Sequence, residues 1–235
     1  MIIPQLEQGL AELGLHPPPE AIPLLDRYAQ MLLEKNRVMN LTAITEPDQV
    51  ASLHMLDCAA LLALGALEGK TLVDVGTGAG FPGMVLKILS PSLDVTLLDS
   101  LAKRLNWLEE VRAVLGLTGV RTVHARAEEY AVKHRESFDA AASRAVAALP
   151  VLAELCLPLV KVGGTFLSMK SVDSDAELAG AAGAIARLGG TVERTADYAI
   201  PGTDVHHRVI VIRKIGKTPE RYPRAFAKIK KSPLS

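Results

Sequence analysis

The sequence predicts an α/β fold: a doubly wound, mostly parallel sheet of seven strands, preceded by a helical cap. Three observations lead to this prediction. From residue 70 onward, short apolar or β-branched segments alternate with amphipathic segments of helical length. A glycine-rich loop follows the first of these strands, and the residues before that strand show helical spacing. Strands and helices that alternate in this way form βαβ units, in which the strands run parallel.

The helical cap is expected over residues 1–67. Prolines at 17–19 separate a short first segment from residues 22–35, where apolar side chains recur at helical spacing. A further helix is predicted over residues 46–67, with Pro47 near its start and Gly65 near its end.

The main domain is expected over residues 68–216, followed by a basic C-terminal tail over residues 217–235. Its predicted strands are 71–75, 94–98, 120–124, 138–142, 165–169, 191–199 and 208–213. Its predicted helices are 82–90, 102–115, 127–133, 146–160 and 174–188. No helix is predicted between the last two strands, only a turn at residues 201–204, so these strands should pair antiparallel at one edge of the sheet.

The composition is typical of a protein with a large hydrophobic core in a reducing compartment. Hydrophobic residues make up 49% of the 235 residues, enough for a large core, and aromatic residues only 4%. Cys58 and Cys156 show no pairing pattern, so a reducing, cytoplasmic setting is expected and Cys156 is interpreted as a core residue. Neither a signal peptide nor a membrane span is predicted.

The net charge is zero, but the charges are unevenly distributed. Residues 206–235 contain nine Lys or Arg residues and one acid, a balance of +8, which leaves −8 on the rest. A basic end on an acidic body is a candidate contact for phosphate groups. A solvated, partly frayed tail is an equally good interpretation of the charge alone.

The stretch Leu72–Gly83 is the most informative in the chain. An apolar strand runs into a loop in which glycine recurs as G-x-G-x-G at 76, 78 and 80, and Pro82 then marks a first helical turn. Such a unit binds nucleotides. Phe81 occupies the place where a dinucleotide-binding fingerprint has its third glycine, so the match to that fingerprint is incomplete.

Two carboxylates indicate which nucleotide is bound. Asp74, just before the loop, would repel a pyrophosphate and favour an ammonium or sulfonium group. Asp99 closes the second strand, where a carboxylate accepts hydrogen bonds from a ribose diol. S-adenosylmethionine carries both cations and no phosphate, so Asp74, Gly76 and Gly78 are predicted to hold its methionine end. Two structural alternatives stay open: Asp74 caps a helix, and Asp99 is the N-cap of the following helix.

Further candidates follow the third and fourth strands. Ala127 and Glu128 are placed to bind adenine, although Glu128 is equally well explained as a first-turn acid on a helix dipole. Arg144 is expected to face the cofactor's carboxylate or the substrate, with a surface salt bridge as the alternative. His54 and Asp57 have the spacing of an acid–base pair or half a metal site. No further ligand is spaced nearby, so no metal is predicted and a structural role between cap and domain is favoured.

Several motifs resemble the RsmG (GidB) family of 16S rRNA guanine-N7 methyltransferases. They are Asn40-Leu41-Thr42-Ala43-Ile44-Thr45, His54-Met55-Leu56-Asp57, Val73–Gly83, Leu97–Ser100 with Lys103-Arg104, Arg126–Glu129, Ser143-Arg144-Ala145, Met169-Lys170 and the Thr218-Pro219…Tyr222-Pro223-Arg224 segment. The first and last are the most specific. The chain departs from the family pattern at Cys58, at His207 and after Arg224.

The resemblance implies a class I methyltransferase that transfers a methyl group from S-adenosylmethionine to N7 of one guanine in a loop of 16S rRNA, leaving S-adenosylhomocysteine. It places cofactor contacts at Gly76, Phe81, Ala127, Glu128 and Arg144. Guanine N7 carries a lone pair and no proton, so no general base is required. Lys170, at the end of the fifth strand, and Arg144 are candidates for positioning the substrate. The predicted RNA contacts are Lys170, Arg208, Arg221 and Arg224.

The resemblance also implies that 16S rRNA or the small ribosomal subunit is the partner of a cytoplasmic monomer. Two other functions fit parts of the sequence. An NAD-dependent oxidoreductase would share the fold and Asp99 but is disfavoured by Asp74 and Phe81. A non-catalytic ribosome-assembly factor is disfavoured by the intact loop, Asp99 and Arg144.

Overall fold

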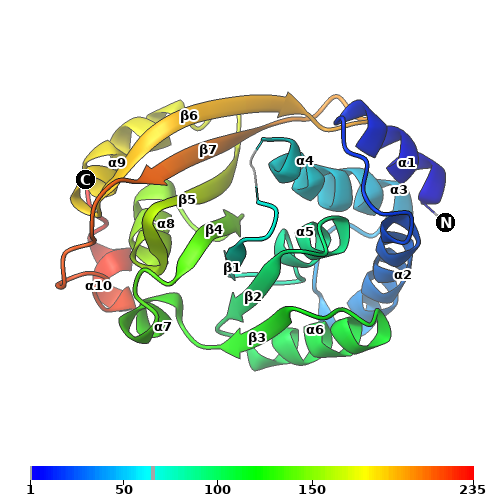
Figure 1. Cartoon of the computed structure of the whole chain (residues 1–235), viewed down its shortest axis with the longest axis horizontal. Helices are drawn as coiled ribbons and strands as arrows, with labels where there is room; N and C mark the ends of the chain where they lie inside the picture. The colour runs from blue at the N-terminus through cyan, green and yellow to red at the C-terminus, as the bar shows by residue number, and fades with distance from the viewer. Residues whose placement is uncertain (1, 65–66) are drawn as a thin grey trace.

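The computed structural model describes residues 2–64 and 67–235 (Figure 1). Its strands are β1 (Thr71–Val75), β2 (Asp94–Asp99), β3 (Val120–His124), β4 (Phe138–Arg144), β5 (Val160–Ser171), β6 (Gly190–Ala199) and β7 (His206–Lys214). Its α-helices are α1 (Ile3–Glu12), α2 (Ala21–Met39), α3 (Pro47–Val50), α4 (Asp57–Leu64), α5 (Gly83–Leu89), α6 (Ala102–Val114), α7 (Ala127–Lys133), α8 (Leu149–Cys156), α9 (Asp175–Arg187) and α10 (Phe226–Lys231).

The strands form one seven-stranded sheet in the order β3-β2-β1-β4-β5-β7-β6. Strands β1 to β5 run parallel, and β7 lies antiparallel between β5 and β6. The predicted fold and the antiparallel edge pair are therefore confirmed. The strand order reverses between β1 and β4, and in doubly wound sheets ligands bind at the carboxyl ends of the strands beside such a reversal.

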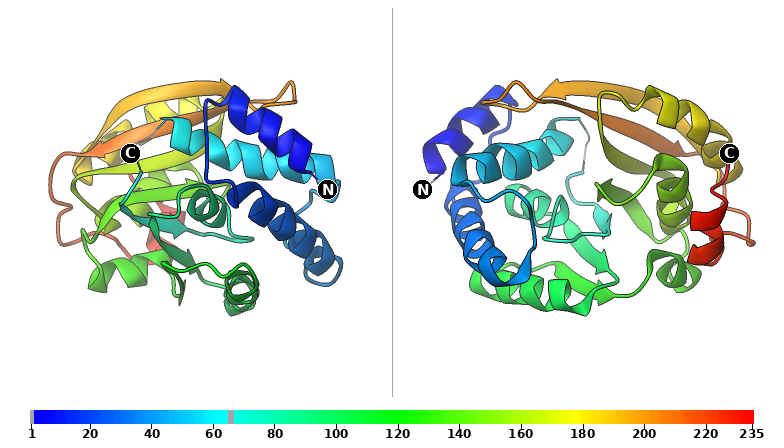
Figure 2. Two further views of the ribbon diagram at one scale, coloured as in Figure 1. Left: turned by 45° about the vertical axis from the view of Figure 1, so that its right-hand side comes forward. Right: turned by 180° about the vertical axis from the view of Figure 1, so that it is seen from behind.

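Helices cover both faces of the sheet (Figure 2). Alternate residues of β1 point to opposite faces: Leu72 joins a core shared with α1, α2, α4, α5 and α6, and Val73 joins a core shared with α7 to α10. Burial on both faces explains why the central strands are continuously apolar. Because the N-terminal helices share the first core, the cap packs directly on the sheet. The division of the chain at residue 67 remains our proposal.

Several elements differ from the sequence prediction. The helix expected over residues 46–67 consists of α3, a π-helical segment over Ala51–Leu56, and α4. Its predicted end at Gly65 lies outside the described residues. The helix expected over 146–160 is the shorter α8, which has a proline in its first turn and is followed by a 3₁₀ turn at Leu157–Leu159. Strand β5 therefore begins earlier than predicted.

The C-terminal segment also differs, because it contains the regular helix α10, which the charge pattern did not predict. None of the helices in the described part of the chain combines the length and apolar character that crossing a bilayer requires.

Candidate functional site

A cavity of about 720 Å³ opens at the carboxyl ends of β1, β2, β3 and β4. The segments that follow these four strands line it, together with residues from the cap, from β7 and from α10. The structure brings most of the predicted cofactor residues together in this lining: Gly76, Gly78, Phe81, Asp99, Ala127, Glu128 and Arg144. Asp74 and the predicted RNA contacts Lys170, Arg208, Arg221 and Arg224 lie outside it.

The glycine loop depends on left-handed backbone conformations. Gly76 has a φ of 73° and Gly78 a φ of 57°, which glycine adopts without strain. The N–H groups of Gly76 and Thr77 both donate to the carbonyl of Leu98, at 2.8 and 3.1 Å, and so fix the loop to the end of β2. At Gly80 a side chain would collide with the hydroxyl of Tyr28 from α2. The glycine spacing therefore allows both the turn and the close packing of the cap.

Asp74 supports this loop from behind. Its side chain is fully buried, and Oδ2 accepts hydrogen bonds from the Thr77 hydroxyl at 2.6 Å and from the Gly83 N–H at 2.8 Å. Burial raises the pKa of Asp74 to about 6, against the effect of these two hydrogen bonds. The carboxylate therefore caps the start of α5 and orders the loop, as the helix-cap alternative has it, and the predicted contact of Asp74 with the cofactor's cation stays a prediction.

Asp99 connects two segments at the edge of the cavity. Its Oδ2 accepts from Gly78 N–H at 2.9 Å, and its Oδ1 accepts from Leu101 N–H at the same distance. The guanidinium of Arg104 lies 3.4 Å from Oδ2. Because Arg104 also donates to Oδ2, this oxygen already accepts two hydrogen bonds, whereas Oδ1 accepts only one and keeps a second lone pair. The predicted contact with a ribose diol stays a prediction. The N-cap alternative is wrong, because Leu101 is the N-cap of α6 and Asp99 accepts from the N–H of Leu101.

The start of α7 forms another wall of the cavity. Ala127 and Glu128 both line it, and the Glu128 side chain is buried whereas that of Glu129 is exposed. Burial raises the pKa of Glu128. A carboxylate placed only for the helix dipole needs no burial, so the position of Glu128 favours a contact inside the cavity over the dipole alternative.

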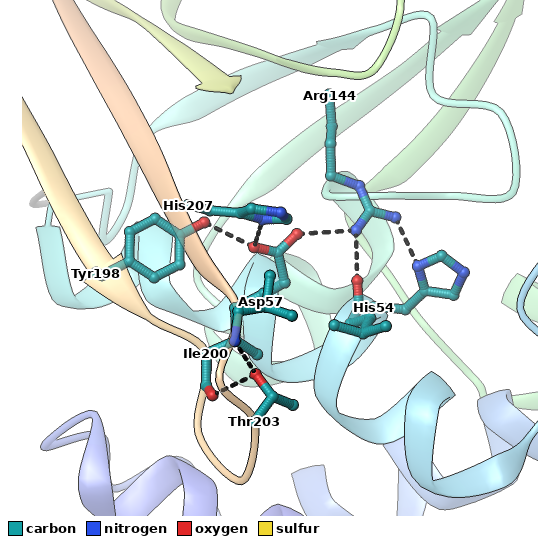
Figure 3. A network of polar contacts seen from close by, with 9 residues as sticks. His54, Asp57, Arg144, Tyr198, Ile200, Thr203 and His207 are labelled. Carbon is teal, nitrogen blue, oxygen red and sulfur yellow. Dashed lines mark hydrogen bonds and ion pairs between the residues drawn. The ribbon is translucent and has the colours of Figure 1, made fainter. Parts of the chain in front are cut away.

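Arg144 joins the cap to the end of β4 (Figure 3). Its Nη1 donates to the carbonyl of Leu53 at 2.9 Å and to Asp57 Oδ2 at 3.0 Å, and its Nη2 contacts His54 Nδ1 at 2.9 Å. The guanidinium carbon also lies 4.9 Å from the centre of the Phe81 ring. Both residues of this ion pair line the cavity and are largely shielded from solvent, so the alternative of a surface salt bridge is wrong.

His54 and Asp57 lie where a structural role predicts them, between cap and sheet. His54 Nε2 contacts the Thr42 hydroxyl at 2.7 Å, and its ring stacks on Phe81 with centroids 4.5 Å apart. Burial and the nearby Arg144 lower the pKa of His54 to about 3, so the imidazole is neutral at physiological pH. Across the part of the chain that the structure describes, no group of three or more His, Cys, Asp or Glu residues is arranged to hold a metal ion.

Asp57 also reaches residues that the sequence did not identify. Its Oδ1 accepts from the Tyr198 hydroxyl at 2.7 Å and contacts His207 Nδ1 at 2.8 Å (Figure 3). Burial opposes ionisation of Asp57, but the hydrogen bonds from His207 and Tyr198 and the charge of Arg144 outweigh it and lower the pKa. The hydrogen bond to Asp57 raises the pKa of His207. Sequence gives no local signal for these contacts, because the partners are 141 and 150 residues apart.

Three of the four predicted RNA-binding residues have protein partners. Lys170 donates to Glu177 at 2.6 Å and to the carbonyl of Ala147 at 2.8 Å. Lys170 thus ties the segment after β4 to α9, and its predicted contact with RNA stays a prediction. Arg144, which the sequence paired with it as a positioning residue, does line the cavity.

Arg208 and Arg224 also have carboxylate partners, and their predicted RNA contacts stay predictions. Arg208 forms ion pairs with both Asp175 and Asp197, and Arg224 binds the fully buried Glu154 at 2.6 Å. Arg221 is exposed, with its guanidinium 5.2 Å from the centre of the Tyr222 ring, so it stays a candidate for RNA binding. Counting charges along the sequence could not distinguish the paired arginines from the exposed Arg221, because the partner carboxylates belong to other elements of the fold.

Comparison with known proteins adds a family and a fold. The profile of the GidB family, described as rRNA small subunit methyltransferase G, matches residues 21–201. The protein named ribosomal RNA small subunit methyltransferase G from Alkaliphilus metalliredigens is 46% identical, with 97% of each chain covered. The protein of that name from Limosilactobacillus reuteri is 44% identical, with 98% of each chain covered.

Solved structures are similar in fold at low sequence identity. TrmN from Thermus thermophilus has a TM-score of 0.53 and 23% identity, with 67% of this chain and 48% of that one covered. M. jannaschii TYW2 in complex with AdoMet has a TM-score of 0.51 and 16% identity, with 64% and 71% covered. These structural neighbours support the class I methyltransferase fold.

Proposed function

We propose a complete reaction for this chain, which belongs to the rRNA small subunit methyltransferase G (GidB) family: transfer of a methyl group from S-adenosylmethionine to N7 of a guanine in 16S rRNA. The chain is an rRNA methyltransferase by its family. The observation that carries the rest is the cavity in which the glycine loop, Asp99, the start of α7 and Arg144 meet.

The residues of the cavity fit S-adenosylmethionine. Asp99 keeps acceptor capacity for the ribose hydroxyls, and Ala127 and Glu128 offer a backbone amide and a carboxyl for the adenine edge. Arg144 supplies a cation for the carboxylate of the methionine end. A volume of about 720 Å³ lies within the range of sites for small molecules and cofactors. These contacts remain proposals.

The bound cofactor supplies an electrophilic methyl group on a sulfonium. Guanine N7 carries a lone pair in the plane of the ring and has no proton, so the protein need not remove one. The groups around Arg144 suit this chemistry: Asp57 is already bonded on both oxygens, and the low pKa of His54 leaves it a weak base. The task of these residues is to hold the base in line with the reacting methyl group.

The RNA substrate has to present one accessible guanine, which a single-stranded or splayed loop does. Exposed cations near the cavity are proposed to contact its phosphates. They include Arg126 beside the start of α7, Arg221, and Lys228, Lys230 and Lys231 on α10. We further propose that the protein acts as a monomer in the cytoplasm on 16S rRNA or the small subunit.

Methyl transfer from tritium-labelled S-adenosylmethionine to 16S rRNA of a strain that lacks this activity tests the proposal. We expect one guanine to be labelled, and mapping of the modified base should place the methyl group on N7. A methyl group on any other atom would overturn the N7 assignment and leave the methyltransferase class in place. Binding of S-adenosylhomocysteine without transfer to any RNA would favour an assembly factor, and hydride transfer from NADH would favour an oxidoreductase.

A further inference from the structure

The C-terminal segment is anchored to the main domain through several independent contacts. Arg224 and its backbone N–H both bind Glu154 of α8, and Tyr222, Ile229 and Leu234 are buried. Arg135, just after α7, donates to the carbonyl of Thr218 at 3.0 Å and also to that of Tyr222. Helix α10 consequently lies against α8 and beside α7 (Figure 1). The basic tail thus has a fixed position at one side of the cavity.

Phe226, the first residue of α10, borders the cavity. It lies at the same end as Ala127 and Glu128, because the guanidinium of the adjacent Arg126 is 5.2 Å from the centre of the Phe226 ring. The ring is half-buried, and it packs partly against the apolar core that α8 shares with α7. Arg126 itself is exposed and also lines the cavity.

Phe226 differs in its surroundings from Phe81, which also lines the cavity. Phe81 is 5% exposed and packs against His54, Arg144 and Tyr28. Phe226 is half-buried, so more of its side chain is accessible than that of Phe81, and it borders the cavity next to the residues assigned to adenine. An aromatic ring with an accessible face stacks on a purine base, and an arginine beside it strengthens such a platform.

We propose that Phe226 stacks on the adenine of the cofactor and that the C-terminal segment is therefore part of the cofactor site. This inference rests on the proposed function, because it assumes that the cavity binds S-adenosylmethionine. The anchoring contacts of Arg224 and Ile229 explain how a residue so near the end of the chain is held in place.

Isothermal titration calorimetry with two ligands tests this role. S-adenosylhomocysteine carries the whole cofactor skeleton, and 5′-methylthioadenosine carries the adenine and ribose without the amino acid. Phe226→Ala should weaken both by a similar factor, on the order of tenfold, because base–aromatic stacking is lost from each. Phe226→Tyr should bind as the wild type does. Phe226→Leu, which keeps the apolar contact with the core, should resemble Phe226→Ala in affinity while retaining the thermal stability of the wild type.

Glu220→Ala is the matched control, since Glu220 is exposed on the same segment and does not line the cavity. It should leave both affinities unchanged. Wild-type affinity in Phe226→Leu, or a loss confined to S-adenosylhomocysteine, would overturn the stacking role. Failure of the wild-type protein to bind either ligand would instead refute the proposed cofactor, so the two failures are distinguishable.

Discussion

The Arg144–Asp57 and Arg224–Glu154 pairs each join an arginine that is 15% exposed to a carboxylate that is fully buried. Their surroundings differ. Asp57 shares its oxygens among Arg144, Tyr198 and His207, and the cluster lines the cavity. Glu154 receives the side chain and the backbone N–H of one residue, Arg224, and lies outside the cavity lining. The same pairing therefore serves to position functional groups in one place and to anchor a segment in the other.

The largest expected effect is on stability and comes from the anchoring pair. Arg224→Ala leaves the carboxylate of Glu154 buried without its charged partner, which should lower the free energy of unfolding by about 3–5 kcal/mol. Urea unfolding followed by circular dichroism measures the change. The double variant Glu154→Leu with Arg224→Met should recover most of the loss, because apolar replacement of both partners removes the buried charge. A loss below about 1 kcal/mol in Arg224→Ala would show that the pair does not anchor the segment.

The second effect concerns activity. Arg144→Lys keeps a positive charge beside Asp57 but cannot reach Leu53, Asp57 and His54 together. We expect kcat/KM for methyl transfer to fall on the order of 100-fold, as when one preorganised hydrogen-bond donor is removed from an active site. Arg224→Lys is the matched control and should change kcat/KM by less than about threefold, within ~0.7 kcal/mol of the wild-type barrier. Equal losses of activity in Arg144→Lys and Arg224→Lys would contradict the separate roles of the two pairs.

The third effect is a pH dependence that belongs to the Asp57 cluster. Its hydrogen bond to Asp57 raises the pKa of His207 above its ordinary value of 6.5, so the folded protein holds this proton more tightly than the unfolded chain. The resulting stabilisation is fully present below pH 6.5 and is lost as the pH rises through the folded-state pKa. His207→Gln should therefore be less stable than the wild type at about pH 6, by at most about 1 kcal/mol for a partly exposed pair.

At about pH 9 His207 is neutral, so the wild type and His207→Gln should differ less in free energy of unfolding. The remaining difference is the contribution of the neutral hydrogen bond to Asp57. Urea midpoints between about pH 5.5 and pH 9 measure it. His54 is present in both proteins, so its lowered pKa cancels in the comparison. Arg144 and Tyr198, which also face Asp57, do not change charge in this range. A stability difference between the wild type and His207→Gln that grows with pH would contradict the ion pair between His207 and Asp57.

The smallest expected effect is on KM for RNA, and it should distinguish exposed cations from those with a carboxylate partner. The double variant Lys228→Ala with Lys230→Ala should raise KM for RNA a few-fold and make log KM less dependent on log salt, by about 0.7 for each phosphate that is no longer neutralised. Lys170→Ala removes a lysine that is already bonded to Glu177, so it should leave the salt dependence unchanged. Methylation assays across a salt series measure both. If Lys170→Ala changes the slope and the double variant does not, the sequence-based assignment of Lys170 is the better one.

Features that depend on neighbouring residues were predictable from the sequence. The alternation of strands and helices predicted the fold, and the spacing of Gly76 and Gly78 predicted the loop, because each follows from local backbone conformation. The position of Asp99 at the end of β2 follows from the same periodicity. A parallel sheet brings the ends of its strands to one edge, so residues at those ends were expected to meet, and they line one cavity.

Features that depend on distant partners were decided only by the tertiary structure. The sequence contains the charges of Arg208 and Arg224, but only folding brings Asp197 and Glu154 to them and removes both arginines from the set of exposed cations. The sequence places Asp74 before the loop, but only packing decides that its carboxylate faces Thr77 and Gly83.

The sequence by itself determined the family, the order of the elements and the segments that meet at the cavity. The tertiary structure decided which charges remain accessible, that Asp57 connects the cap to β7, and that Phe226 from the C-terminal segment borders the cavity. The physical reason is that periodicity and turn chemistry act over a few residues, whereas desolvation and ion pairing depend on whatever the completed fold brings into contact.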